Sequence, residues 1–210
     1  MNVFITGANG GIGKEIKSLL IKEGVNVIYY SSNEMDLSKA FDVSNVPVLD
    51  GFIHAAGINL LRHHADLNEE ELFKILNVNV FSFISLCGKL KFNDKANIIA
   101  IGSFYSENTK ENRIQYSMSK HALFAAVKTI ALEKSKNLIK VNMVSPGFVD
   151  TELTRKNNSS ERIENLQSNT PLGLSEPIHI ANMCSYLINK NHGITGQNML
   201  IDCGYSLKHL

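Results

Sequence analysis

The amino-acid sequence predicts an α/β fold: a doubly wound parallel sheet of about seven strands, with helices on both faces, in a single domain spanning residues 1–210. Three observations support this prediction. Short apolar segments typical of strands alternate with segments of helical period along the chain. The first strand is followed at once by a glycine-rich turn and a helix. At 210 residues the chain is long enough for one α/β domain, which would bury roughly 70% of its extended surface.

The apolar patterns place the individual elements in order. Strands are predicted at Asn2–Thr6, Asn26–Tyr30, Glu34–Leu37 (a short one), Gly51–His54, Asn97–Ile101, Ile139–Val144 and Asn198–Ile201. Helices are predicted at Gly11–Glu23, at Asn68–Asn79 with a continuation toward Leu90, at Ser117–Lys134 and at Pro177–Ile188. This alternation of strands and helices is typical of a parallel sheet.

The turn after the first strand is the first candidate site. It reads Thr6-Gly7-Ala8-Asn9-Gly10-Gly11-Ile12-Gly13. Glycines allow a tight turn and let the backbone approach a pyrophosphate, whose charge then lies at the positive end of the helix. An ordinary glycine-rich turn is the alternative interpretation. The flanking strand and helix favour dinucleotide binding.

The second candidate site is the segment Tyr116-Ser117-Met118-Ser119-Lys120. It places a phenol and an ammonium group four residues apart in a helical segment, so both side chains project from the same face. A phenol loses its proton near pH ~10, and a nearby cation brings that pKa toward neutrality. The spacing therefore indicates an acid–base pair, although a tyrosine and a lysine at this distance also occur by chance on solvated helices.

Further segments complete a pattern over almost the whole chain. They are His54-Ala55-Ala56-Gly57, Asn79, Ser103 thirteen residues before Tyr116, Pro146-Gly147 with Thr151, and Ile194-Thr195-Gly196-Gln197 followed by Ile201-Asp202-Cys203-Gly204. With the glycine turn, this order resembles the short-chain dehydrogenase/reductase family, in particular its 3-oxoacyl-[acyl-carrier-protein] reductase-like oxidoreductases. His54 replaces the asparagine of the family's NAAG motif, and Cys203 replaces a glycine of its closing motif. The resemblance implies a Rossmann-type fold.

The resemblance also implies a role for each catalytic residue. Tyr116 would exchange a proton with the carbonyl oxygen as hydride reaches its carbon. Lys120 would lower the pKa of Tyr116 and hold the nicotinamide ribose. Ser103 would bind the substrate oxygen, and Asn79 would hold its helix in a local kink and anchor a water next to Lys120. The implied cofactor site comprises Gly7, Asn9, Gly11, Ile12, Gly13, Ser31, Ser32, Asp36, Leu37, Ala55, Ala56, Gly57, Tyr116, Lys120, Pro146, Gly147, Val149 and Thr151.

Cofactor preference depends on the end of the second strand. An acidic residue there would bind the ribose hydroxyls of NAD(H) and repel the extra phosphate of NADP(H). By alignment this place is Ser31, followed by Ser32, and neither is acidic. NADP(H) is therefore favoured. NAD(H) stays possible, because no arginine is present and Glu34 or Asp36 could reach the ribose.

Two regions differ in character from the rest. Residues 151–175 include the polar run from Asn157 to Thr170, which by position resembles the family's mobile substrate lid; a surface insertion explains its composition equally well. Between Tyr30 and Asp36 there is no room for the helix that joins the second and third strands in relatives. The stretch between Asn79 and Ser103 is also several residues short of the family's usual length.

Composition narrows the remaining possibilities. The net charge of +1 and the dispersed lysines give no case for nucleic-acid binding. We expect no membrane span, because the sequence has no stretch of ~20 apolar residues. We expect no metal site and no disulfide, because Cys87, Cys184 and Cys203 are odd in number and lack CxxC spacing. Arg62-His63-His64 is expected in a solvated loop, or as a cationic edge that favours an anionic substrate. A cytoplasmic homodimer or homotetramer is expected.

Two functional hypotheses follow. The first is an active NAD(P)(H)-dependent oxidoreductase for a small-molecule carbonyl or secondary alcohol. The second is a cofactor-binding sensor or scaffold that has lost turnover. All of Asn79, Ser103, Tyr116 and Lys120 are present, which favours the enzyme.

Overall fold

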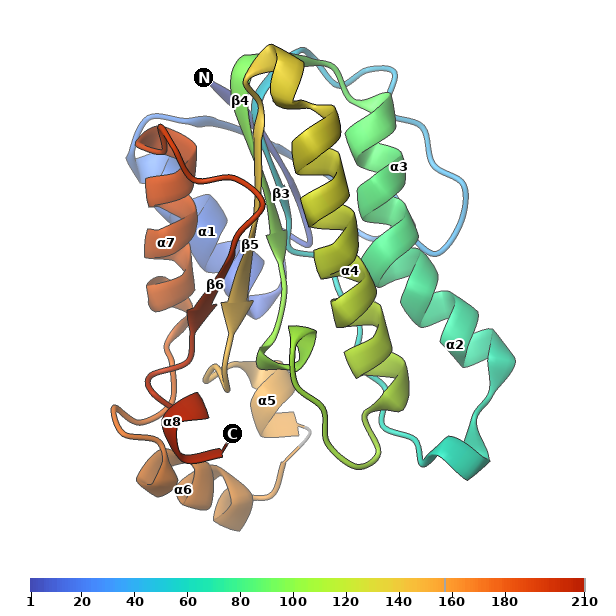
Figure 1. Ribbon diagram of the computed structural model, residues 1–210, viewed down its shortest axis with the longest axis vertical. Helices are drawn as coiled ribbons and strands as arrows, with labels where there is room; N and C mark the ends of the chain where they lie inside the picture. The colour runs from blue at the N-terminus through green and yellow to red at the C-terminus, as the bar shows by residue number, and fades with distance from the viewer. Residues whose placement is uncertain (157, 210) are drawn as a thin grey trace.

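The computed structural model describes residues 1–156 and 158–209. Within these residues, six parallel strands form one sheet in the order β2-β1-β3-β4-β5-β6 (Figure 1). The strands are β1 (Asn2–Thr6), β2 (Asn26–Tyr29), β3 (Leu49–His54), β4 (Phe92–Ile101), β5 (Lys140–Pro146) and β6 (Asn198–Ile201). The order reverses direction between β1 and β3, which is where this class of sheet binds its ligands, beyond the carboxyl ends of the strands.

Helices cover both faces of the sheet, as predicted. On one face lie α1 (Gly11–Lys22) and α7 (Pro177–Asn189); on the other lie α2 (Glu69–Leu76), α3 (Ser82–Lys89) and α4 (Ile114–Glu133) (Figure 1). Successive strand residues point to opposite faces. Ile53 and Ile99 therefore pack against the α1 and α7 side, whereas Phe52 and Ile98 pack against the α3 and α4 side. Two apolar cores follow from this alternation.

The connection between β2 and β3 corrects one prediction. Residues Glu34–Leu37 form turns and coil, so the seventh strand predicted there is absent from the described chain. Local hydrogen bonds turn the backbone instead: Glu34 accepts from Ser31, and Asp36 accepts from the backbone N–H of Ser38. The expected absence of a crossover helix in residues 30–48 is confirmed. This coil covers the sheet by burying three apolar anchors, Met35, Val43 and Val46.

The helical run after β3 is interrupted at the predicted place. Between α2 and α3, residues Asn77–Phe81 form one π-helical turn, η2, which contains Asn79.

The continuous helical run Glu69–Lys89 is long and apolar enough to cross a membrane by length and composition alone, which we had not expected. That finding is weak evidence for a span, because core helices pass the same test, and here Phe83 and Leu86 of this run are fully buried against the sheet.

Short helices gather below the carboxyl ends of β5 and β6 (Figure 1). They are α5 (Glu152–Lys156), α6 (Ser160–Asn169) and α8 (Ser206–His209), with three 3-10 turns elsewhere at His64–Asp66, Phe104–Ser106 and Ser135–Asn137. The predicted lid residues 151–175 thus contain two helices that composition did not indicate; Asn157 of this segment lies outside the described residues. Ser159 caps α6 by accepting from the backbone N–H of Arg162, and Leu166 buries its inner face.

Candidate active site

The glycine turn is shaped so that its backbone is exposed to the cleft. Gly7 has φ +68°, and a Cβ on Gly13 would overlap the Gly7 carbonyl oxygen. A Cβ on Gly11 would lie 2.9 Å from the methyl carbon of Thr151 across the cleft. Helix α1 begins at Gly11 with no side chain capping its first turn. Its free N–H groups and the positive end of the helix suit a pyrophosphate, so the residues present fit a dinucleotide.

The loop after β3 forms the floor beside this turn. Ala55 donates its backbone N–H to the carbonyl of Thr6, and Ala56 donates to the Thr6 hydroxyl at 3.4 Å. Ala55 and Gly57 line the cleft, whereas Gly7 and Ala56 hold the two loops against each other behind it. The glycine turn and the His54-Ala55-Ala56-Gly57 segment therefore lie against each other.

His54, the substitution in the NAAG-like motif, joins β3 to the π turn. Its Nδ1 lies 2.8 Å from the Thr6 hydroxyl and its Nε2 lies 3.2 Å from the Val78 carbonyl oxygen. A carbonyl only accepts, so Nε2 carries the proton and Nδ1 accepts from Thr6. Burial, and next the charge of Lys120, lower the pKa of His54 to about 3. The ring is therefore a neutral connector between β1 and η2.

Asn79 lies directly behind the cleft and ties three segments together. Its Oδ1 accepts from the Ile58 N–H at 2.9 Å, and its Nδ2 donates to the Ile58 carbonyl and to the Ser119 hydroxyl, both at 3.0 Å. The side chain is fully buried. The predicted kink is confirmed as the π turn, a feature that is common at functional sites. Asn79 positions the loop at Ile58 and the helix that carries Lys120.

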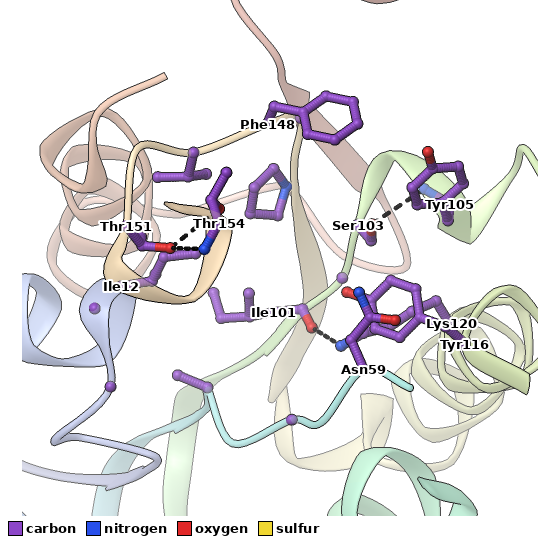
Figure 2. A pocket seen from close by; sticks show the side chains of 18 of the residues that line it. Ile12, Asn59, Ile101, Ser103, Tyr105, Tyr116, Lys120, Phe148, Thr151 and Thr154 are labelled. Carbon is purple, nitrogen blue, oxygen red and sulfur yellow. Dashed lines mark hydrogen bonds between the residues drawn. The ribbon is translucent and has the colours of Figure 1, made fainter. Parts of the chain in front are cut away.

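Tyr116 and Lys120 lie four residues apart on α4, which begins at Ile114, three residues earlier than predicted. The Lys120 ammonium lies 5.7 Å from the centre of the Tyr116 ring and donates to the Ile101 carbonyl at 2.8 Å (Figure 2). Burial lowers the pKa of Lys120 to about 8. Lys120 is thus held at the carboxyl end of β4, inside the cleft.

The pKa of Tyr116 corrects the sequence-based argument. Burial raises it above its ordinary value, while the hydrogen bond with Ser103 and the charge of Arg113 lower it. Lys120, which lies 5.7 Å from the ring centre and donates to the Ile101 carbonyl, is not among the groups that shift this pKa, so the predicted lowering by Lys120 is not found. The phenol is consequently protonated at neutral pH, as a proton donor must be.

Ser103 faces Tyr116 from the end of β4. Its Oγ accepts from the Tyr105 N–H at 3.2 Å (Figure 2). Its own N–H donates to the Ser106 hydroxyl. Its hydroxyl also makes the hydrogen bond with Tyr116 that lowers the pKa of the phenol, so the two hydroxyls lie together and could both contact one substrate oxygen.

The segment after β5 closes the opposite wall. A Cβ on Gly147 would lie 2.7 Å from the Cβ of Asp202, so glycine is needed for the close approach of β5 and β6. Val149 pairs with Ser175, and the Thr151 hydroxyl lies 3.1 Å from that of Thr154 (Figure 2). This segment carries Phe148 and Thr151 over the cleft.

Twelve of the predicted site residues line this single cleft: Gly11, Ile12, Gly13, Ala55, Gly57, Ser103, Tyr116, Lys120, Pro146, Gly147, Val149 and Thr151. Five others are found elsewhere. Asn9 accepts from Lys17 on α1, and Ser31, Ser32, Asp36 and Leu37 lie in the β2–β3 connection. Position 31 itself is not acidic, but Glu34, which the sequence left as a possible ribose ligand, accepts from both the N–H and the hydroxyl of Ser31 at 2.7 Å. The missing crossover helix lets the chain turn back there.

Several cleft residues escaped sequence reasoning, among them Asn59, Tyr105, Arg113, Phe148 and Asn158. Arg113 was detectable, because it lies three residues before Tyr116 and so on the same side of the helix. The Oδ1 atom of Asn59 is buried without a partner, so it is available to a bound molecule. The His63–His64 segment, with ring centres 4.2 Å apart, lies outside this cleft.

Known proteins match this architecture over nearly its whole length. A family model described as enoyl-(acyl carrier protein) reductase matches residues 32–206. A 3-oxoacyl-[acyl-carrier-protein] reductase of Buchnera aphidicola is 30% identical over 233 residues, covering 96% of this chain and 95% of the relative. The crystal structure of a short chain dehydrogenase family protein from Francisella tularensis has a TM-score of 0.87 at 30% identity and covers 98% of both chains.

A third similarity concerns a structure with a bound cofactor. 4-Hydroxyisoleucine dehydrogenase complexed with NADH has a TM-score of 0.84 at 27% identity, with 98% of each chain covered. The glycine turn, the Ser103–Tyr116–Lys120 arrangement and these matches lead to one conclusion. The chain belongs to the short-chain dehydrogenase/reductase family of oxidoreductases.

Proposed function

We propose that this protein transfers hydride between a nicotinamide dinucleotide and the carbon of a small-molecule carbonyl or secondary alcohol, with Tyr116 as the acid–base group. The observation that carries the proposal is the convergence of Ser103, Tyr116 and Lys120 on the same cleft as the glycine turn. A bound dinucleotide would supply or accept the hydride. The protein would supply orientation and the proton.

The protein's own groups suit this division of work. In the reducing direction Tyr116, kept protonated by burial, gives its proton to the carbonyl oxygen. Ser103 directs its hydroxyl to the same oxygen and stabilises its developing charge. Lys120, whose pKa is lowered to about 8, can return a proton to the phenol near neutral pH. Asn79 fixes the Ile58 loop and the helix that carries Lys120 relative to each other, through its bonds to the Ile58 N–H and the Ser119 hydroxyl.

We propose further that Glu34 shifts cofactor preference from NADP(H), which the sequence favoured, toward NAD(H). The carboxylate of Glu34 accepts from Ser31 at the end of β2, and these hydrogen bonds lower the pKa of Glu34. An ionised group at this place would repel a 2′-phosphate and accept from ribose hydroxyls. Lys17 is a cation that would act in the opposite direction and favour the 2′-phosphate. Its ammonium lies 4.2 Å from the centre of the Tyr29 ring, at the end of β2.

The lid and the oligomer remain proposals as well. Residues 151–175 would cover the substrate, since Ile163 and Leu166 of α6 pack with Tyr105, Tyr116 and Phe148.

A homodimer or homotetramer would cover exposed apolar side chains on the outer face of α2, η2 and α3. These are Phe73, Phe81 and Ile84, which are 58%, 49% and 44% exposed. Sedimentation of the purified protein would test the oligomer.

The test of the main proposal separates turnover from binding. A panel of ketones and secondary alcohols is followed at the nicotinamide absorbance band with wild type and Tyr116→Phe. Calorimetric titration measures cofactor binding by both proteins. Turnover that is lost in Tyr116→Phe while binding persists would support the enzyme. Cofactor binding without turnover of any panel member would instead support the sensor or scaffold.

A further inference from the structure

Arg113 places a positive charge in the cleft beside the reacting phenol. The residue immediately precedes α4, three positions before Tyr116, and its partly buried side chain lines the cleft. The guanidinium carbon lies 5.4 Å from the centre of the Tyr105 ring. That ring meets the Tyr116 ring edge to face, with centres 6.3 Å apart. The charge is close enough to Tyr116 to lower the pKa of the phenol.

No carboxylate of the described chain neutralises this charge. The ion pairs among residues 1–156 and 158–209 join Lys39 to Asp36, Arg62 to Glu71 and Arg155 to Asp150. Arg113 takes part in none of them. A partly buried guanidinium without a counter-ion inside a binding cleft calls for an anionic ligand, because five N–H donors there are otherwise left to solvent.

Two further cations lie near Arg113. Burial raises the pKa of the Tyr105 phenol, and the charges of Arg113 and of Arg162 on α6 oppose that rise. Burial, and next the charges of Arg162 and Arg113, lower the pKa of Lys110. The side chain of Arg162 donates to the amide oxygen of Asn165 at 3.5 Å. Glu111 is the acid near Lys110, and it is exposed. The local potential at this end of the cleft is therefore positive.

This positive end is separate from the expected phosphate site. The glycine turn and Thr151, which would flank a pyrophosphate, lie across the cleft from Tyr105 (Figure 2). Tyr105, Phe148 and Asn158 surround the substrate side instead, and the first two belong to the aromatic cluster packed on α6. Arg113 is thus placed to contact the substrate rather than the cofactor's phosphates.

Resting on the proposed function, we propose that the substrate is an oxo acid or hydroxy acid, and that Arg113 binds its carboxylate. A guanidinium fork matches a carboxylate with two parallel hydrogen bonds. The carboxylate would lie a few bonds from the reacting carbon, because Arg113 acts on the same phenol that transfers the proton. The carboxylate itself is unchanged: hydride adds to the oxo carbon and the Tyr116 proton adds to its oxygen.

The first test compares matched acids and esters. Wild type, Arg113→Gln and Arg113→Lys are assayed with 2-oxobutanoate, 3-oxobutanoate and 4-oxopentanoate and with the methyl ester of each. We expect wild type to prefer at least one acid to its ester, and Arg113→Gln to lower the acid-to-ester ratio of kcat/KM by about 10- to 100-fold. Arg113→Lys should lower the acid-to-ester ratio by a smaller factor, because lysine keeps the positive charge but cannot form two parallel hydrogen bonds. Because the acid and the ester react at the same phenol, any effect of Arg113 on the pKa of Tyr116 changes both rates alike and cancels in the ratio.

The matched control is Lys128→Gln, which removes one positive charge from α4, the helix that Arg113 precedes. Lys128 is exposed and stacks on Phe124, away from the cleft. Its acid-to-ester ratio should equal that of wild type. An equal loss in Lys128→Gln and Arg113→Gln would overturn the proposal, because the effect would then be general electrostatics.

A second measurement does not depend on turnover. Binding of the same acids to Tyr116→Phe and to Tyr116→Phe/Arg113→Gln is measured by calorimetry in the presence of cofactor. Acid binding that is lost in the double variant supports the Arg113 site, even if the oxidoreductase proposal fails. Equal affinities for acids and esters, or no effect of Arg113→Gln, would overturn it. So would a preference for dihydroxyacetone phosphate over every acid, because the site would then be built for phosphate.

Discussion

The part of the cleft around Tyr116 and Lys120 and the β2–β3 connection are built differently. Under the proposed function, they would bind the nicotinamide end and the adenosine end of the cofactor. At the nicotinamide end, the decisive hydrogen bonds join residues far apart in sequence: Asn79 to Ile58 across 21 positions, Asn79 to Ser119 across 40 and Lys120 to Ile101 across 19. At the adenosine end, Ser31 to Glu34 spans three positions and Asp36 to Ser38 spans two. The first set is buried and the second is exposed.

This difference separates what is rigid from what is adjustable. Buried long-range contacts cannot be altered singly without leaving polar groups unpaired, so the chemistry is strongly constrained. Exposed local turns carry little of the folding energy and can change with small cost. We therefore expect substitutions at the nicotinamide end to damage rate or stability, and substitutions at the adenosine end to shift preference alone.

The largest effect is expected from Tyr116→Phe. The ring and its packing against Tyr105 are kept, while the transferable proton is removed. Turnover should fall by about 10²-fold or more, with cofactor affinity unchanged. Steady-state kinetics and calorimetric titration measure the two effects. Near-normal turnover on a validated substrate would show that Tyr116 is not the proton donor.

Asn79→Ala should have the next largest effect. It leaves the N–H and carbonyl of Ile58 and the hydroxyl of Ser119 without this partner, each at a cost of about 1–3 kcal/mol if it stays dry. Denaturant unfolding should show a lower free energy of unfolding, and kcat should fall with Lys120 less well placed. Asn77→Ala is the control from the same π turn, because the Asn77 side chain donates to the Ser38 carbonyl, outside the cleft. Equal losses in the two variants would contradict a special role for Asn79.

The buried, neutral His54 leads us to expect that the protein loses stability toward unfolding as the pH falls. Its folded-state pKa of about 3 lies below the ordinary 6.5, so the unfolded chain binds more protons between these values and stability is lost as pH falls through that window. Between pH 7 and pH 5 the loss from this group should be about 2 kcal/mol. His54→Asn, which restores an amide at the motif position, should remove this loss. Parallel urea unfolding curves for both proteins over this range are the measurement, and identical pH slopes would rule the mechanism out.

The smallest effect is expected at the adenosine end, from Glu34→Gln. Removing the charge next to Ser31 should raise the affinity for NADPH relative to NADH by roughly 3- to 10-fold, with kcat nearly constant. Asp42→Asn is the matched control, since Asp42 accepts from Ser44 in a similar turn away from the cleft. Dissociation constants for both cofactors decide the outcome. A wild type that already prefers NADPH would favour the sequence-based prediction over the role of Glu34.

Much of the fold was readable without coordinates. Strands were predicted at Gly51–His54 and Asn97–Ile101, and both segments lie in the sheet, where Phe52 and Ile98 face one core and Ile53 and Ile99 the other. The glycine turn and the Tyr116–Lys120 spacing also predicted their own local geometry, because a tight turn and a helical repeat are properties of consecutive residues. The strand predicted at Glu34–Leu37 failed where side chains compete for backbone donors.

The sequence by itself therefore determined the order of elements, the two apolar faces of the sheet and the candidate residues for the proposed chemistry. Only the tertiary structure decided how those residues act on one another. It placed Lys120 on the Ile101 carbonyl, turned Glu34 back onto Ser31 and brought the unneutralised Arg113 beside Tyr116. These outcomes depend on burial and on charges contributed by distant or independently turning segments. A pKa is set by that three-dimensional environment rather than by the neighbours along the chain.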